Sequence, residues 1–264
     1  MEIVDTHAHL DMPPFETDRD EVISRARQTG VNTIITIGID LESSRKAIAL
    51  AEKYPGVLAT VGVHPQDSMG IKKEDIDRLA GMARHPRVVA VGEIGLDFYR
   101  NCSPREVQIQ VLQWQLEMAK EVGLPVIIHC RQAQEEILPI LFDWSNSANI
   151  SDGRPIGVIH CFSGNLRTAE QYMEMGFYIS IGAYIGYPSS TQLRDSVRSI
   201  PVERLLIETD CPFLPPQKYR GKRNEPSYTL MTLGVLAEIK QVSLEEIARQ
   251  TTENARKVFN LRSL

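Results

Sequence analysis

Residues 2–11 read EIVDTHAHLD, and the two histidines in this run decide the fold. The residues before them alternate as in a short strand, in which side chains two positions apart point to the same face. His7 and His9 can therefore reach a single point. Neutral imidazole is a common ligand of divalent metal ions, so this geometry suits a metal site. An H-x-H pattern is weak evidence by itself, and further ligands must come from elsewhere in the chain.

Further candidate ligands also follow apolar, strand-like runs. Three more of the six histidines and two carboxylates stand in this position, and these residues are His64, His129, His160, Glu93 and Asp210. A single histidine at a strand end is more often a packing residue. Five of six histidines together with two acids make packing alone a poor explanation. His85, before Pro86 in a polar stretch, is typical of a surface histidine.

Strands and helices alternate along the chain. Apolar, β-branched runs predict eight strands, at residues 2–6, 33–38, 58–63, 88–92, 125–129, 156–160, 178–181 and 205–208. The clearest helical patterns lie at 18–28, 41–53, 73–84, 104–122 and 166–175, with two closing helices within 227–261. Gly30, Gly123 and Gly176 each close a helix, and Ser243 with Glu246 predicts a capping box. Helices between strands indicate parallel pairing, because parallel neighbours need crossover connections.

Eight such units can form a closed barrel or an open, doubly wound sheet. The candidate ligands follow strands one, four, five, six and eight, and only a closed ring brings the first and eighth strands together. In such barrels the chemistry lies at the carboxyl ends of the strands. An open dinucleotide-binding sheet would need a G-x-G-x-x-G turn after its first strand, which this chain lacks. We predict an α/β protein, a (β/α)8 TIM barrel forming a single domain over residues 1–264.

The amino-acid composition limits the cellular compartment and the binding partners that we expect for this protein. The net charge of -5 argues against broad adhesion to nucleic acid or anionic membranes. No apolar run approaches a membrane span of about 20 residues, and the N-terminus does not resemble a signal peptide. The four cysteines form no C-x-x-C pair, so we expect free thiols and a cytoplasmic location. Three of them directly follow candidate ligands, and we expect their thiols to face the surrounding helices; these are Cys130, Cys161 and Cys211. No obligate protein partner is evident.

Several motifs together resemble the TatD family of metal-dependent deoxyribonucleases, which are amidohydrolase-like TIM barrels. They are DTHAHLD at 5–11, GVHP at 62–65, GEIGLDFYR at 92–100, IHCR at 128–131, IHCFSG at 159–164, ETDCPFL at 208–214 and RGKRNEP at 220–226. The resemblance covers nearly the whole chain. It implies one metal held by His7, His9 and Asp210, a second held by His129 and His160, and Glu93 bridging the two. The chain departs from the family at Gln66, where a second histidine often stands, and in residues 181–188.

The resemblance also implies the chemistry. Two divalent ions about 3.5–4 Å apart (Zn, Mn or Mg) turn a bridging water into hydroxide and stabilise the attacking and leaving oxygens of a phosphodiester. We expect Glu93, His64 and Asp210 to form the catalytic group. Asp210 either takes a proton from the water or is only a ligand. His64 either contacts the phosphate or packs the site. Glu208, one layer below Asp210, is expected either to support the site from behind its ligands or to pair with a buried cation, rather than to act directly.

Any nucleic acid must be held by residues around the opening at the carboxyl end of the barrel, which we call the rim. Lys218, Arg220, Lys222 and Arg223 follow the eighth strand, and Arg100 and Arg131 follow the fourth and fifth, where they could neutralise phosphates. Nearby aromatic residues either stack unpaired bases or only close the barrel mouth; these are Phe98, Tyr99, Phe213 and Tyr219. The predicted substrate-binding residues are His64, Arg131, Lys222 and Arg223. Such a cleft suits single-stranded DNA ends and exonuclease action better than internal cutting of a duplex.

Three classes of function remain open. The first is the deoxyribonuclease, a hydrolase of ester bonds, which we favour. The second is a hydrolase of carbonyl substrates (ester, lactone, amide or aminoacyl-tRNA), because the same scaffold can attack a carbonyl. The basic loop around Lys222 favours phosphate over a neutral amide. The third is a noncatalytic metal-binding scaffold, which predicts missing ligands, whereas all six are present.

Overall fold

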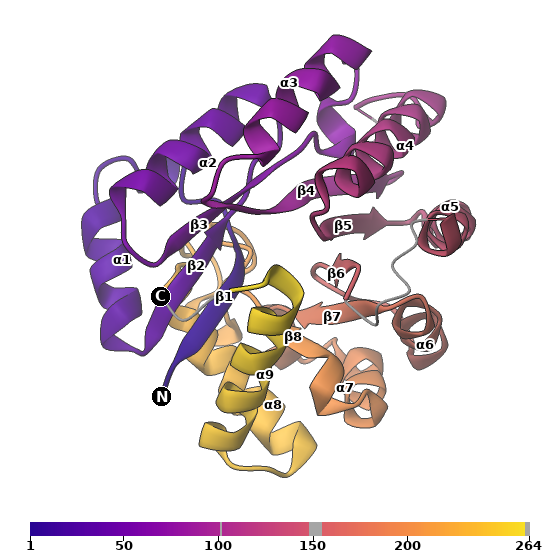
Figure 1. Cartoon of the computed structure of the whole chain (residues 1–264). Helices are drawn as coiled ribbons and strands as arrows, with labels where there is room; N and C mark the ends of the chain where they lie inside the picture. Colours follow the sequence, from indigo (N-terminus) through magenta and orange to yellow (C-terminus); the bar gives the residue numbers. More distant parts are fainter. Residues whose placement is uncertain (101, 148–154, 262–264) are drawn as a thin grey trace.

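The carboxyl ends of eight parallel strands meet at one end of a ring (Figure 1). The computed structural model describes residues 1–100, 102–147 and 155–261. Its sheet runs in chain order, and each strand from β1 to β7 pairs in parallel with the next. The strands are β1 (Ile3–Ala8), β2 (Val31–Thr36), β3 (Val57–Val61), β4 (Val88–Asp97), β5 (Val126–Arg131), β6 (Gly157–Ile159), β7 (Phe177–Ile181) and β8 (Leu205–Ile207).

Contacts between β1 and the segment after β8 close the ring. Ala8 forms a parallel bridge with Cys211, and the backbone N–H of Asp210 donates to the carbonyl oxygen of His7 at 2.8 Å. Below this point, the buried carboxylate of Asp5 accepts hydrogen bonds from the backbone N–H and the hydroxyl of Thr209, at 3.0 and 2.6 Å. The predicted TIM barrel is confirmed, and the open-sheet alternative is wrong.

Helices surround this ring and connect its strands (Figure 1). They are α1 (Arg19–Gln28), α2 (Leu41–Lys53), α3 (Lys73–Ala83), α4 (Arg105–Val122), α5 (Gln134–Ser147), α6 (Leu166–Glu174), α7 (Thr191–Ser199), α8 (Thr229–Lys240) and α9 (Leu244–Phe259). The predicted helices are present, and α5 and α7 fill the two connections that had no clear pattern. Gly123 ends α4 with a φ of 71°, a left-handed conformation that glycine adopts without strain. The Ser243 hydroxyl caps α9 by accepting from the N–H of Glu246.

Two strands extend further than their apolar runs predicted. β4 continues to Asp97 and β5 to Arg131, so Glu93 lies within its strand rather than after it, and His129 lies two residues before the end of β5. The continuation is stable because Ile94 remains fully buried and pairs with Ile128 across the two strands. The glycines of the GEIGLD motif interrupt the apolar pattern, and the pairing of β4 with β5 shifts its register between Val91 and Ile94 before it continues to Asp97.

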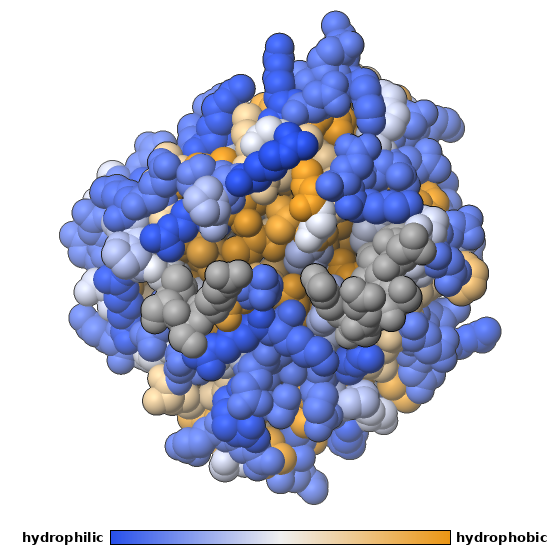
Figure 2. Space-filling model, in the orientation of Figure 1, coloured by the Kyte–Doolittle hydropathy of each residue, from blue (hydrophilic) through white to orange (hydrophobic). Residues whose placement is uncertain are grey.

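The amino-terminal end of the barrel is filled with apolar side chains. A layer contributed by all eight strands packs there against the last turns of α9; it consists of Val4, Ile35, Leu58, Ala90, Ile127, Val158, Tyr178 and Leu206, with Ala255, Val258 and Phe259 from the helix. On the face seen in Figure 2, hydrophilic side chains cover most of the outer surface and hydrophobic ones gather toward the middle of the ring. None of the described helices is long and apolar enough to cross a membrane.

Candidate metal centre

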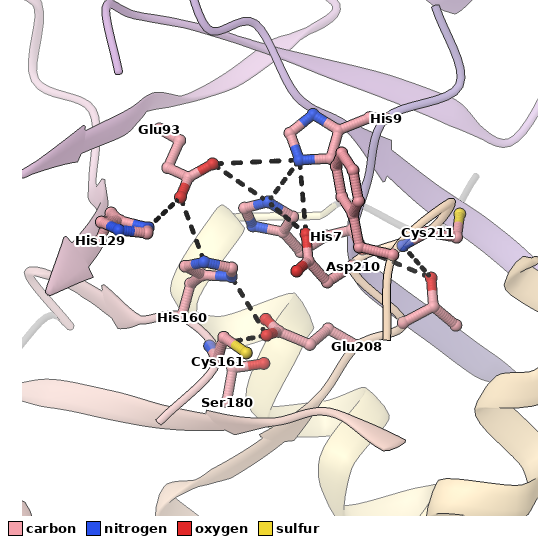
Figure 3. Close-up of polar contacts among 12 residues, drawn as sticks. His7, His9, Glu93, His129, His160, Cys161, Ser180, Glu208, Asp210 and Cys211 are labelled. Carbon is pink, nitrogen blue, oxygen red and sulfur yellow. Dashed lines mark hydrogen bonds and ion pairs between the residues drawn. The ribbon is translucent and has the colours of Figure 1, made fainter. Parts of the chain in front are cut away.

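The six predicted ligands converge at the carboxyl end of the barrel (Figure 3). They come from five strands or from the residues just beyond them: His7 and His9 from β1, Glu93 from β4, His129 from β5, His160 from β6 and Asp210 from β8. The prediction that His7 and His9 reach one point is confirmed, since their Nε2 atoms lie 3.2 Å apart. Closure of the ring places Asp210 beside them, with its Oδ1 3.4 Å from His9 Nε2 and 3.7 Å from His7 Nε2.

Glu93 lies between two groups of histidines. Its Oε2 is 3.4 Å from His7 Nε2 and 4.0 Å from His9 Nε2. Its Oε1 is 2.7 Å from His129 Nδ1 and 3.1 Å from His160 Nε2. The two oxygens of one carboxylate therefore face different sets of imidazoles, as a bridging ligand requires.

Buried carboxylates and imidazoles shift one another's pKa values in this site. Burial alone would raise the pKa of Glu93, but His160, His64 and His129 hold it well below its ordinary value. Burial would likewise lower the pKa of His160, yet the charges of Glu93 and Glu208 raise it well above the usual range. Asp210 also has a lowered pKa, because the hydrogen bond and charge of His9 outweigh its burial. Ionised carboxylates thus face His160, whose raised pKa favours the protonated ring, and His7, whose pKa is lowered by burial.

The donor atoms fit divalent metal ions. Among the residues that the structure describes, three sets have one donor atom per residue with all atoms within 4.8 Å of one another: His7, His9 and Glu93; His7, His160 and Asp210; and His64, Glu93 and His129. Imidazole nitrogens combined with carboxylate oxygens suit zinc and manganese, and suit magnesium less well. Buried His7 and His9 are anchored here by their Nε2 contacts, and their Nδ1 atoms have no hydrogen-bond partner among the described residues.

Two buried carboxylates stand behind these histidines. Glu208 Oε1 is 3.1 Å from His160 Nδ1, which confirms that Glu208 contacts a candidate ligand from below. Asp97 Oδ2 is 3.3 Å from His129 Nε2, a contact that was not predicted from the sequence. Its signal was present: Glu93, Gly95 and Asp97 are spaced two apart, so on a strand that extends beyond Gly92 they share one face.

His64 reaches the centre from the loop after β3. Its Nε2 lies 3.8 Å from Glu93 Oε1, and its Nδ1 accepts a hydrogen bond from the backbone N–H of Gln66 at 3.1 Å. Because Nδ1 is an acceptor, the proton of the neutral ring is on Nε2, which makes His64 a donor toward the site rather than a ligand. Burial lowers the pKa of His64 to about 4, which favours that neutral form. Gln66, where the chain departs from the family pattern, accepts from the N–H of Cys102 and joins two rim loops.

Aromatic and cationic side chains surround the opening. The Arg131 guanidinium lies 4.0 Å from the centroid of the Tyr99 ring, which is 55% exposed. Phe213, 47% exposed, packs edge-on against His9 with ring centroids 5.9 Å apart. Phe98 is buried under Arg105, which for this residue favours the alternative of closing the barrel mouth over that of stacking bases. The Tyr219 ring stacks on Tyr228 at 4.4 Å, which leaves one of its faces covered.

The basic loop after β8 divides into anchoring and exposed side chains. Arg223 forms two hydrogen bonds to Asp18, of 2.7 and 2.6 Å, and another to the carbonyl oxygen of Pro14. Arg25 of α1 forms a similar ion pair with Glu225 at 2.7 Å. Lys222 is exposed and makes no ion pair within the described ranges. Arg223 is therefore engaged in holding the loop to α1, and Lys222 points to solvent.

All four cysteines are free, as expected. Cys130 lies beside Tyr172 of α6, so its thiol faces the helices as predicted. Cys161 does not follow that rule, because its φ of 47° breaks the strand alternation. Its burial raises its thiol pKa well above the usual range, and the charges of Asp210 and Glu208 raise it further, which places it next to the site.

Comparison with known proteins finds relatives that match nearly the whole chain. The profile of the TatD-related DNase family matches residues 4–260. The chain is 40% identical to the uncharacterized metal-dependent hydrolase YabD of Bacillus subtilis, covering 98% of this chain and 99% of that protein. It is 36% identical to the 3'-5' ssDNA/RNA exonuclease TatD of Salmonella typhimurium, covering 97% and 98%. The crystal structure of YjjV, a TatD homologue from Escherichia coli, superposes with a TM-score of 0.90 at 34% identity, covering 98% of each chain. The chain therefore belongs to the TatD-related DNase family of metal-dependent hydrolases.

Proposed function

We propose that this protein is a deoxyribonuclease that uses two divalent metal ions (Zn, Mn or Mg) to remove nucleotides from single-stranded DNA ends. His7, His9 and Asp210 would hold one ion, His129 and His160 the other, and Glu93 both. The observation that carries this proposal is the division of Glu93, whose Oε2 faces His7 and whose Oε1 faces His129 and His160.

The side chains around that centre have separate tasks. When bound, divalent ions lower the pKa of water and offset the negative charge of a reacting phosphodiester. The Asp210 carboxylate would orient the attacking water and take its proton, since its lowered pKa keeps it ionised. His64 would donate from Nε2 to a non-bridging phosphate oxygen, because its Nδ1 is occupied as an acceptor.

The rim supports a nucleic-acid substrate. Arg131 and Lys222 would neutralise backbone phosphates, and Arg223 would contribute by holding the basic loop in place. Tyr99 and Phe213 are the exposed aromatic residues on which unpaired bases would stack. Relatives of this chain are named as exonucleases of both single-stranded DNA and RNA, so RNA belongs in the same test. Free thiols agree with a cytoplasmic location.

A substrate panel tests the proposal. The metal-stripped protein, reloaded separately with Zn²⁺, Mn²⁺ or Mg²⁺, is offered single-stranded DNA, duplex DNA, RNA, a lactone, an ester and an amide. We expect stepwise shortening of single strands and little turnover of the carbonyl substrates. Efficient lactone or amide turnover without DNA cleavage would overturn the nuclease proposal in favour of the carbonyl hydrolase.

A further inference from the structure

The Asp97 carboxylate uses both of its oxygens as acceptors, each for a different purpose. Oδ1 accepts from the backbone N–H groups of Tyr99 and Arg100, at 2.9 and 3.2 Å. Oδ2 lies 3.3 Å from Nε2 of His129. The side chain is almost completely buried. Gln108 fixes the backbone of Asp97 as well, accepting from its N–H at 2.9 Å and donating to its carbonyl oxygen at 3.1 Å.

These contacts determine which nitrogen of His129 carries a proton. With the ionised Asp97 as acceptor, the proton belongs on Nε2. Nδ1 then presents a lone pair toward Glu93 Oε1, 2.7 Å away. Two acceptors so close to each other require a proton or a metal ion. We propose that Asp97 is a positioning residue that fixes the tautomer of His129 and thereby presents Nδ1 to a metal ion.

The same residue links that ligand to the rim. Arg131 lies two positions after His129 on β5, and its guanidinium stacks on the ring of Tyr99, whose N–H is held by Asp97. The backbone N–H of Phe98 also donates to the carbonyl oxygen of Arg131 at 3.0 Å. A closed set of contacts therefore runs from His129 through Arg131, Tyr99 and Asp97 back to His129. Asp97 orients the ligand and the adjoining wall of the opening together.

Glu208 provides a matched comparison. It backs His160 as Asp97 backs His129, but its Oε1 alone contacts both His160 Nδ1 and the N–H of Cys161, at 3.1 and 2.6 Å. Its Oε2 is buried without a hydrogen-bond partner among the described residues. An amide can therefore replace Glu208 and keep these contacts through its oxygen. Asp97 uses one oxygen for the two backbone N–H groups and the other for His129, so an amide at this position can keep only one of these two sets of contacts.

The test compares Asp97→Asn with Glu208→Gln by Zn²⁺ binding to the full-length apoprotein, in competition with a fluorescent zinc indicator. In Asp97→Asn, the amide oxygen retains the two rim N–H groups and the amide NH₂ opposes His129. We expect the affinity for one of two bound Zn²⁺ ions to fall by about 10–100-fold, and the affinity for the other to stay unchanged. Glu208→Gln should lower the affinity for either Zn²⁺ ion by less than about tenfold. Unchanged binding in Asp97→Asn, or equal losses in both variants, would overturn the proposal.

A second measurement needs no variant. Long-range ¹H–¹⁵N NMR of the zinc-loaded, unmodified protein should show a proton on Nε2 of His129 and zinc at Nδ1. Zinc at Nε2 would overturn the proposal even if Asp97→Asn failed to fold. The inference rests on the proposed metal centre but not on the substrate. A protein that binds two Zn²⁺ ions in this way and fails to cleave DNA would contradict the proposed nuclease function alone.

Discussion

At the residue scale, the arrangement of the site depends on Glu93. It is buried, ionised and surrounded by histidines contributed by other strands. Its loss would leave two groups of imidazoles with no shared anion between them. Removal of His7 or of His160, by contrast, takes away one nitrogen from one group.

Glu93→Ala should therefore lower metal occupancy more than His7→Ala or His160→Ala, and should abolish DNA cleavage. Metal per chain is measured by elemental analysis after dialysis, and circular dichroism checks that the barrel remains folded. Glu93→Gln, which preserves the shape of the side chain, is the control for packing. Two metal ions per chain in Glu93→Ala would show that Glu93 is not the bridge.

Asp210→Asn should separate metal binding from chemistry. The amide retains one ligating oxygen near His9, but it cannot take a proton from water. We expect at least partial metal retention and a fall in kcat of about 10²–10⁴, the usual contribution of a general base. Metal content and single-turnover rates are compared with those of the unmodified protein. A near-normal rate would leave Asp210 as a ligand only.

At the element scale, the loop after β8 is fixed to α1 by some of its side chains, whereas Lys222 is exposed to solvent. Two ion pairs, Arg223 with Asp18 and Arg25 with Glu225, join it to α1. Hydrogen bonds from the Asn224 amide to the carbonyl oxygens of Thr209 and Phe213, at 2.8 and 2.7 Å, fix the turn that carries Asp210. Two adjacent basic residues, Lys222 and Arg223, therefore have different expected effects.

Lys222→Ala should reduce the slope of log affinity against log salt for single-stranded DNA by about 0.7, one phosphate contact, without changing thermal stability. Arg223→Ala should lower the free energy of unfolding by about 0.5–1 kcal/mol, because it removes a partly exposed ion pair. Binding is titrated in an Asp210→Asn background to prevent cleavage. Parallel salt lines for Lys222→Ala and the reference protein would exclude this loop from DNA binding.

At the scale of the whole molecule, metal binding is coupled to protonation and to stability. Burial alone would lower the pKa of His129, but its hydrogen bonds to Asp97 and Glu93 raise it, and His160 is raised further. Metal ions must displace these protons. Zn²⁺ affinity should therefore fall as pH falls and rise as pH increases, until both imidazoles are neutral in the apoprotein.

Chelation should give an inactive apoprotein that regains activity with a divalent ion. At a free Zn²⁺ concentration about 100 times the Kd, a single site adds about 2.7 kcal/mol to the free energy of unfolding. Calorimetric titration of the apoprotein in buffers of different ionisation enthalpy counts the protons released. Full activity after verified metal removal, or zinc binding without proton release, would contradict the coupling.

Most of the site could be predicted because its information is local. Each ligand follows an apolar run in the sequence, and the alternation of side chains along a strand fixes the face on which it lies. His7 with His9, and Glu208 below Asp210, were predicted correctly for this reason. Asp97 was missed because glycines hide the continuation of β4, which its pairing with β5 reveals. The sequence left two roles open for Phe98 because its exposure depends on packing under Arg105.

The sequence by itself determined the eight-strand alternation, the barrel class, the family and the six residues that meet at its carboxyl end. The alternation and the barrel class follow from periodicity and residue type, which act over a few neighbouring positions, whereas the family and the choice of the six ligands rest on the resemblance of the motifs to the TatD family. Only the tertiary structure decided which oxygen of Glu93 faces which imidazole, which carboxylate backs His129, and which basic residues remain exposed. Arg223 and Lys222 are adjacent and alike in charge, yet Asp18, 205 positions away from Arg223, engages only the former. Contacts between residues so distant in the chain arise when the ring closes, and no local pattern contains them.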